Sequence, residues 1–223
     1  MSSGLLAQEL ESIKLNPPDL ARGHPFMEAL SVKASASEWS DRDLSLQDLS
    51  DLMWAANGLN RPDEDKTTAS SAMNAHDVDI YVFMKDGVFV YDYRNHELDA
   101  VVGGDHRSAV MMRRPPRPET VPEDSGNAVA ADAPAAAAPP AEAAIQIVLI
   151  SDSDRFRAGT NELKYEWGAI GAGIISQNIS LFCAATGLKT RPRASMDKEK
   201  IKDLLKLKET QYVFLNHPVG YAK

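Results

Sequence analysis

Few side chains in this sequence have types and spacing typical of catalysis. The five histidines are scattered, and only His76, followed directly by Asp77, could begin a metal site or a hydrolytic triad. A lone His-Asp pair is more commonly a polar turn. The single cysteine, Cys183, can form no intramolecular disulfide, and in its uncharged surroundings the thiol is expected to act as a small apolar group. These residues therefore supply neither a nucleophile nor a set of metal ligands.

Basic side chains gather in one segment near the end of the chain. Residues 189–208 hold eight Lys or Arg and three Asp or Glu (8 − 3 = +5), whereas the whole chain carries 24 − 32 = −8. A small anion could be held by this segment, although a solvated, lysine-rich helix face is the commoner explanation. The negative charge of the whole molecule argues against nucleic acid and anionic membranes as partners.

Several motifs that indicate a particular chemistry are absent from the sequence. The chain has no Gly-x-Gly-x-x-Gly, no phosphate loop ending in Gly-Lys-Ser/Thr, no Gly-x-Ser-x-Gly and no His-Glu-x-x-His. Near the N-terminus, Glu9 and Glu11 stand where a secretory signal has an apolar run, so we expect a cytoplasmic protein. Motifs alone leave the reaction undefined.

One long uncharged stretch is expected to form a central helix. Residues 167–188 contain no charged side chain and are long enough to cross a bilayer, but four glycines and polar residues such as Gln177 and Asn178 favour a core helix beginning near Thr160. Gly168, Ala172 and Ser176 place small residues at four-residue intervals. This spacing predicts close packing of another backbone, either inside the core or across a dimer axis.

The other helices and strands that must position a site can be predicted from hydrophobic periodicity and helix-capping residues. Helices are predicted over residues 26–32, from the N-cap Ser45 to Gly58, and from the N-cap Asp197 to residue 207. Strands are predicted over residues 79–84 and 88–93, joined by a turn in which Gly87 takes a positive φ, and over residues 145–150 and 211–216. This order predicts an α+β fold with helices on the faces of a sheet.

An insertion interrupts this pattern. Residues 111–144 contain seven of the 13 prolines, and residues 128–144 contain eleven alanines. Few side chains there could offset the entropy of ordering the segment, so we expect a mobile excursion at about 111–144 within a single domain spanning residues 1–223.

Four blocks, in order, carry a resemblance to a known family. They are residues 30–39 (LSVKASASEW) with the helical segment 49–61, residues 69–76 (ASSAMNAH), residues 168–188, and residues 192–197 (PRASMD) continuing to residue 221. They resemble the arginine and serine segment, the Pro-Ser-x-x-Asn-x-Gln segment, the central helix and the final flavin loop of the nitroreductase-like FMN-dependent oxidoreductases. Together they cover most of the chain outside the insertion.

The resemblance implies a mostly antiparallel sheet flanked by helices, and a homodimer with FMN at its interface. It also implies electron transfer from NADH or NADPH through the flavin to a small organic acceptor, with no catalytic side chain required. The residues implied to bind the cofactor come from the first, second and fourth blocks and the C-terminus: Lys33, Ala34, Ser35, Ser37, Ser71, Ala72, Asn74, Arg193, Ala194, Ser195 and Lys223.

The resemblance implies that each block binds a particular part of the cofactor. Lys33, Ser35 and Ser37 would serve the phosphate and ribityl chain, and Asn74 the polar edge of the flavin ring. The backbone N–H groups of Ala194 and Ser195 would face flavin N5.

The sequence departs from the family pattern at several of these positions. Lys33 and Ala34 replace paired arginines, Ser37 replaces a third arginine, and His76 replaces a glutamine. Because lysine offers a point charge where arginine offers a bidentate fork, a second hypothesis is a relative that binds flavin weakly or not at all, has lost turnover, and acts as a binding or dimerisation module. A third is an anion-binding regulatory domain built on residues 189–208.

Overall fold

A computed structural model of the chain describes residues 10–111 and 143–223. Apart from its ends, the predicted insertion lies outside the described residues. The described chain forms four α-helices: α1 (Phe26–Val32), α2 (Leu46–Asn57), α3 (Asn161–Thr186) and α4 (Lys198–Leu205). Four short 3-10 turns accompany them: η1 (Pro62–Glu64), η2 (Ala72–Asn74), η3 (Arg107–Ala109) and η4 (Ser153–Arg155).

Seven strands form one sheet in which every pairing is antiparallel, in the order β1-β6-β5-β4-β7-β9-β8. The strands are β1 (Ile13–Lys14), β4 (Val78–Phe83), β5 (Gly87–Asp92), β6 (Glu97–Gly103), β7 (Ile145–Asp152), β8 (Lys189–Thr190) and β9 (Gln211–Gly220). A separate short ribbon pairs β2 (Leu59–Arg61) with β3 (Lys66–Thr67). The predicted α+β class, with helices flanking an antiparallel sheet, is confirmed.

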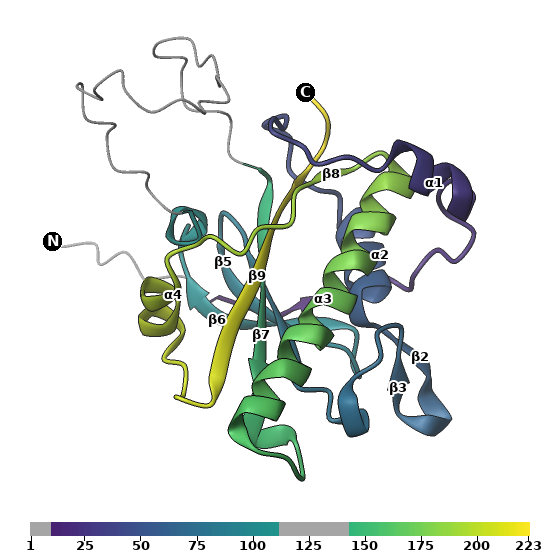
Figure 1. Cartoon of the computed structure of the whole chain (residues 1–223). Coiled ribbons are helices and arrows are strands. Elements are labelled where there is room, and N and C mark those ends of the chain that lie inside the picture. Colours follow the sequence, from purple (N-terminus) through teal and green to yellow (C-terminus); the bar gives the residue numbers. More distant parts are fainter. Residues whose placement is uncertain (1–9, 112–142) are drawn as a thin grey trace, which may run out of the picture.

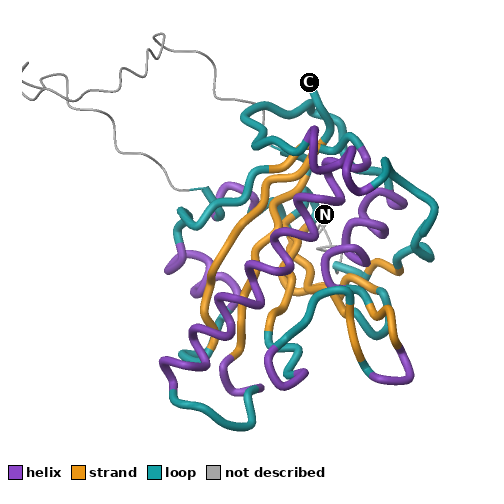
Figure 2. The backbone as a smooth tube through the Cα atoms, turned by 45° about the vertical axis from the view of Figure 1, so that its right-hand side comes forward, coloured by secondary structure: helices purple, strands orange, loops and turns teal. Residues whose placement is uncertain are grey.

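The helices divide between the two faces of the sheet. The long helix α3 runs alongside β9 and β7, with α1 and α2 packed beside it (Figures 1 and 2). Alternate β4 residues such as Ile80 and Val82 enter this larger core, while Phe83 enters a smaller core beneath α4 on the other face. Every residue of the central strand β7 is buried, because both cores meet there.

The small residues of α3 face the sheet. A Cβ atom added at Gly168 would stand 2.9 Å from Ser151 Cβ and 3.2 Å from a ring carbon of Phe214, and Ala172 and Ser176 are buried in the same row. Of the two predicted packing modes, this row serves the one inside the core. Within the described residues α3 is also the one helix whose length and apolar composition would suffice to cross a membrane.

Most helix boundaries agree with the predicted caps. Ser45 accepts a hydrogen bond from the Asp48 N–H, Thr160 from the Leu163 N–H, and Asp197 from the Lys200 N–H. The predicted end of the last helix at residue 207 is wrong, because Lys206 adopts a left-handed φ of 52° and ends α4 at Leu205.

The hairpin between β4 and β5 is confirmed, but the expected reason for its glycine is wrong. Gly87 lies within β5 and is not among the described residues with a positive φ. A Cβ atom there would stand 2.7 Å from the carbonyl oxygen of Val102 and would overlap the side chain of Leu10. Glycine is therefore required by the close approach of neighbouring segments.

Candidate functional site

The first and fourth blocks meet at the edge strand β8. The Ala36 N–H donates to the carbonyl oxygen of Thr190 at 2.9 Å, and the Trp39 indole donates to that of Lys189 at 3.1 Å. These bonds place Lys33, Ala34, Ser35 and Ser37 beside β8, with all four side chains exposed. A cavity of about 190 Å³ opens between Ala34, β8 and the last turns of α3.

The fourth block is held by the neighbouring strand. Arg193 and Asn216 exchange backbone hydrogen bonds at 2.9 and 2.8 Å, and the Asn216 amide donates to the carbonyl oxygen of Ser195 at 3.3 Å. Among the described residues, no hydrogen bond uses the backbone N–H of Ala194 or Ser195. Both residues are exposed. Two backbone donors next to each other are thus free for a ligand.

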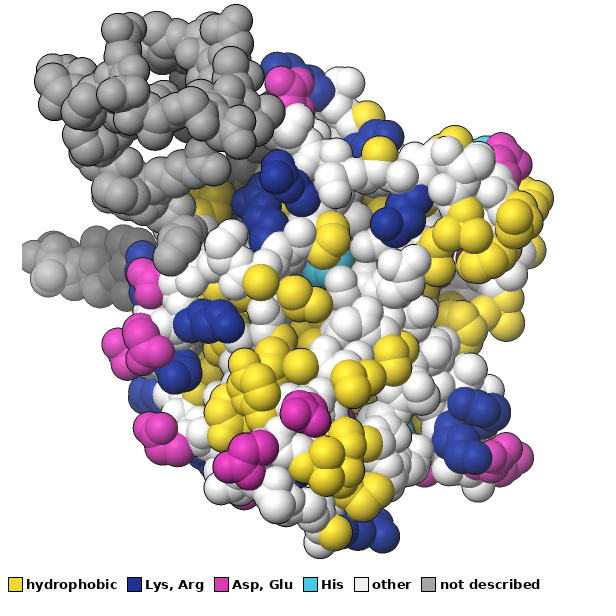
Figure 3. Space-filling model, viewed as in Figure 1, with side chains coloured by type: hydrophobic (Ala, Val, Ile, Leu, Met, Phe, Trp, Pro, Cys, Tyr) yellow, Lys and Arg dark blue, Asp and Glu magenta, His cyan; other side chains and the backbone are white. Residues whose placement is uncertain are grey.

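Two arginines at this edge form no ion pair with the rest of the described chain. Burial and the nearby Arg191 together hold the pKa of Arg193 below its usual value. Neither Arg191 nor Arg193 contacts a carboxylate within residues 10–111 and 143–223. Lys and Arg side chains gather over this part of the surface in Figure 3. Like charges without counterions favour binding of an anion.

The C-terminus reaches the same region. The Ser40 N–H donates to the carbonyl oxygen of Tyr221 at 3.1 Å, and the Tyr221 hydroxyl donates to Asp48 on α2. The Arg42 guanidinium lies 3.4 Å from the centre of the Tyr221 ring. Figure 1 shows the chain end beside the segment that precedes α2, so Lys223 lies near the first block.

The second block forms a strained turn at a different place. Met73, Asn74 and His76 all have left-handed φ values, of 54°, 53° and 47°. Non-glycine residues in this region cost on the order of 1–3 kcal/mol each and persist only where the surroundings hold them. Backbone strain of this kind is concentrated at functional sites.

Hydrogen bonds from three sides hold this turn. The Asn74 amide and His76 Nε2 both donate to the carbonyl oxygen of Asp65, at 3.1 and 2.9 Å, and the His76 N–H donates to Ser71 Oγ at 3.0 Å. The Arg155 guanidinium donates to the carbonyl oxygen of His76 at 2.6 Å. No hydrogen bond within the described chain uses Asn74 Oδ1, so that oxygen can accept from a ligand.

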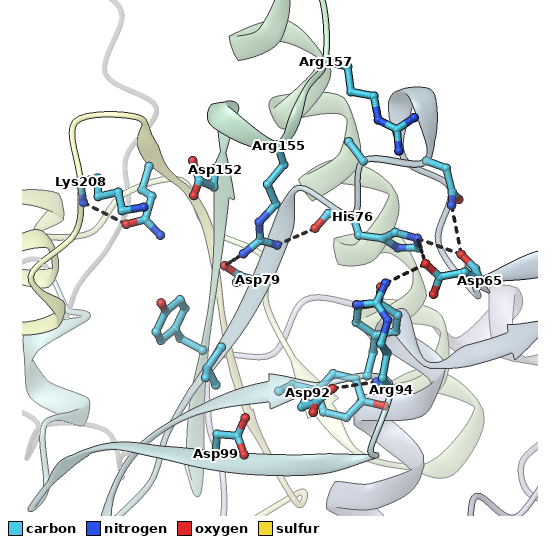
Figure 4. A pocket seen from close by; sticks show the side chains of 17 residues that line it. Asp65, His76, Asp79, Asp92, Arg94, Asp99, Asp152, Arg155, Arg157 and Lys208 are labelled. Atoms are coloured by element: carbon cyan, nitrogen blue, oxygen red, sulfur yellow. Dashed lines mark hydrogen bonds and ion pairs between the residues drawn. The ribbon is translucent and has the colours of Figure 1, made fainter. Parts of the chain in front are cut away.

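A polar cavity of about 700 Å³ lies behind the turn, on the sheet face opposite α3 (Figure 4). Arg155 pairs with Asp79 at 2.6 Å and Arg94 with Asp65 at 2.7 Å, which ties both sides of the turn to the sheet. His76 stacks on Tyr93 with ring centres 4.9 Å apart. The described residues contain no group of three or more potential metal ligands.

The two parts of the site are separated along α3. Gly171 and Ile175 border the second block, whereas Cys183 and Gly187 border the cavity at β8. Twelve helical residues separate each pair, which is about 18 Å at 1.5 Å per residue. One copy of the chain therefore brings the first and fourth blocks together and leaves the second block apart.

Some residues of this site were missed by the analysis of the sequence. Arg191 lies in the basic segment, and its charge was the one available signal. Asp65 contributes a backbone carbonyl, for which the sequence carries no signal. Cys183 is buried as predicted, and burial raises the pKa of its thiol.

Comparison with known proteins identifies the family. The model of the nitroreductase family matches residues 34–221. The chain belongs to the nitroreductase family. Family membership supports a flavin-type oxidoreductase in general. No curated protein matches the sequence.

Solved structures show the same nitroreductase fold. A putative nitroreductase from Ralstonia eutropha JMP134 is 25% identical, with a TM-score of 0.80 over 96% of this chain and 90% of that one. A chain of the Escherichia coli microcin synthetase McbBCD complex is 14% identical, with a TM-score of 0.66 over 85% and 69%. A putative nitroreductase from Anabaena variabilis is 13% identical, with a TM-score of 0.65 over 89% and 38%. The last two likenesses concern the fold alone.

Proposed function

We propose that this nitroreductase family member is a cytoplasmic, FMN-dependent NAD(P)H oxidoreductase that passes electrons to a small organic acceptor. The observation that carries the proposal is the edge at β8. There Arg191 and Arg193, which form no ion pair with the described residues, adjoin the backbone N–H groups of Ala194 and Ser195, which no hydrogen bond among those residues uses. Cations for a phosphate and neutral donors for a ring edge fit FMN.

Each block keeps a distinct part in holding the cofactor. Lys33, Ser35 and Ser37 would bind the phosphate and ribityl chain, and we add Arg191 to Arg193 and Lys223 as the cations that compensate for the absent family arginines. When bound, FMN would supply the redox chemistry, accepting a hydride from NADH or NADPH and delivering electrons to the acceptor. The protein's own task is to bind, orient and shield.

We further propose that two copies of the chain complete each site. Ser71 and Asn74 are expected at the polar edge of the flavin ring, and Ala194 and Ser195 at N5 of the same ring. The positions on α3 that border the second block and the cavity at β8 lie about 18 Å apart, and the fourth block adjoins β8. A homodimer in which one copy supplies residues 33–37 and 193–195 and its partner supplies residues 71–74 would bring them together.

Colour and bleaching of the purified protein test the proposal. The protein should be yellow, or become yellow on addition of FMN and removal of the excess, and NADH or NADPH should bleach the flavin absorption without oxygen. Protein that binds FMN without being bleached would support the binding or dimerisation module. Protein that takes up no FMN would contradict the proposal and favour a relative that keeps the fold without flavin and acts as a binding or dimerisation module.

A further inference from the structure

The strained turn at residues 71–76 is followed directly by a buried carboxyl group whose partners are incomplete. The side chain of Asp77 is fully buried, with 0% of the residue exposed. Its Oδ2 atom accepts a hydrogen bond from Ser151 Oγ at 2.6 Å, but Oδ1 is buried with no hydrogen-bond partner in the described chain. An unpartnered buried carboxyl oxygen is costly, so its retention calls for a reason.

A small cavity joins Asp77 to the turn. Its volume is about 10 Å³, and the side chains that line it include Asn57, Ser71 and Asp77. Gly171 closes it from α3, where a Cβ atom would stand 3.8 Å from Asp77 Oδ1. This volume suits one water molecule, which needs two to four polar partners. The lining offers a carboxyl, a hydroxyl and an amide.

The Ser71 hydroxyl can also form a hydrogen bond to a water molecule in this cavity. Ser71 Oγ accepts from the His76 N–H at 3.0 Å, and within the described residues its own proton is donated to no protein acceptor. A hydroxyl can accept and donate at once. Ser71 can therefore bond to His76 and to a water molecule together.

We propose that Asp77 is a positioning residue that binds one water molecule in this cavity and through it holds the turn 71–76. The proposal rests on the proposed function only in stating that this turn contacts FMN. Asp77 would touch neither the cofactor nor the acceptor. Its effect would be to keep Ser71, Ala72 and Asn74 in one arrangement, so that a ligand meets the turn already ordered.

Burial and some of the neighbouring groups act on the pKa of the Asp77 carboxyl in opposite directions. Burial raises the pKa of Asp77 most strongly, and Asp79 adds to the effect, while the Ser151 hydroxyl and the charge of Arg155 act in the opposite direction. Asp152, whose N–H donates to the Asp77 carbonyl oxygen, and His76 are the other titratable neighbours. A carboxyl group has the planar shape of a primary amide, and each offers two polar atoms. Asn should therefore replace Asp77 well and an apolar residue poorly.

Amide hydrogen exchange on the flavin-free protein tests the positioning role without any cofactor. The reporters are the N–H groups of Asn74 and His76, both bonded to Ser71, and the reference is the Met84 N–H in the β4–β5 hairpin. Asp77→Leu, which keeps the branched shape and the number of non-hydrogen atoms and removes the polar atoms, should speed exchange at residues 74 and 76 about tenfold and leave residue 84 unchanged. Asp77→Asn should exchange like wild type. Asp77→Ala replaces the Leu variant if that does not fold.

Binding of FMN is measured on the same proteins, with Asp99→Asn as a control that removes a carboxylate on β6. Asp77→Leu should weaken FMN binding about tenfold, whereas Asp77→Asn and Asp99→Asn should not. Equal exchange rates in Asp77→Leu and wild type, or equal loss in Asp77→Asn and Asp77→Leu, would overturn the proposal. If the wild type binds no FMN, the proposed function fails while the exchange rates still decide the role of Asp77.

Discussion

At the scale of single residues, Arg191 and Arg193 matter because their charges are close together and form no ion pair within the part of the chain that the structure describes. The Arg193 backbone is fixed by two hydrogen bonds to Asn216, so its side chain can be removed without releasing the loop. The mutual repulsion with Arg191 is relieved when an anion binds between or beside them. An exposed lysine elsewhere would gain far less from the same anion.

Arg193→Ala should therefore weaken FMN binding about 10- to 100-fold, since one charge-assisted hydrogen bond contributes about 1.5–3 kcal/mol. Titration of flavin fluorescence at two salt concentrations measures the affinity. The matched control is Lys200→Ala, which removes an equal charge from the exposed face of α4 and should leave the affinity unchanged. Equal weakening by both variants would mean that only the overall charge of the segment matters.

At the scale of elements, His217 joins three of them. It lies on β9 with no exposed surface, and its ring nitrogens are 3.1 Å from Thr190 Oγ1 on β8 and 2.8 Å from Ser176 Oγ on α3. Desolvation lowers the pKa of His217 to about 4. The neutral ring thus connects the core helix to the strand that supports the first block.

This burial predicts a loss of stability in mild acid. An unfolded histidine, with a pKa near 6.5, binds a proton at a higher pH than the folded one, so His217 lowers the free energy of unfolding as the pH falls from 6.5 to about 4. The loss should total about 3 kcal/mol. Denaturant unfolding of wild type and His217→Gln at several pH values isolates the contribution of His217 to the pH dependence of the free energy of unfolding. Parallel curves for the two proteins would contradict it.

At the scale of the whole molecule, the outer face of α3 and the neighbouring helix α1 expose large apolar side chains. The face of α3 that points away from the sheet exposes Ile170 to 60%, with Gly173 and Gln177 on the same side. The neighbouring α1 exposes Phe26 and Met27. Apolar side chains gather over α1 in Figure 3. Exposed large apolar side chains favour a partner, and the proposed homodimer supplies one.

Ile170→Glu should separate the proposed dimer, because two unpaired carboxylates would be buried where the copies meet. Sedimentation at micromolar concentration should show a monomer for this variant and a dimer for wild type. If each site needs both copies, the variant should lose FMN as well. Val101→Glu, an equally drastic change on β6, is the control and should remain dimeric. A wild-type monomer that retains FMN would contradict the shared site.

Much of the fold follows from local patterns. The N-caps Ser45, Thr160 and Asp197 and the apolar runs of β7 and β9 determine their elements through contacts within a few residues, and the ordered blocks indicate the family. The short strands β1 and β8 cannot be predicted in this way, because two residues show no periodicity and pair only where distant segments meet.

The candidate site, like the fold, could be predicted only in part from the sequence. Residue types along the chain determined the basic segment and the candidate blocks. Only the tertiary structure decided that residues 33–37 lie beside β8, that residues 71–76 form a strained turn about 18 Å away along α3, and that Asp77 is buried behind it. The physical reason is that charge and cap propensity belong to a residue and its neighbours, whereas burial, strain and the pairing of ions depend on which distant segments the packed core brings together.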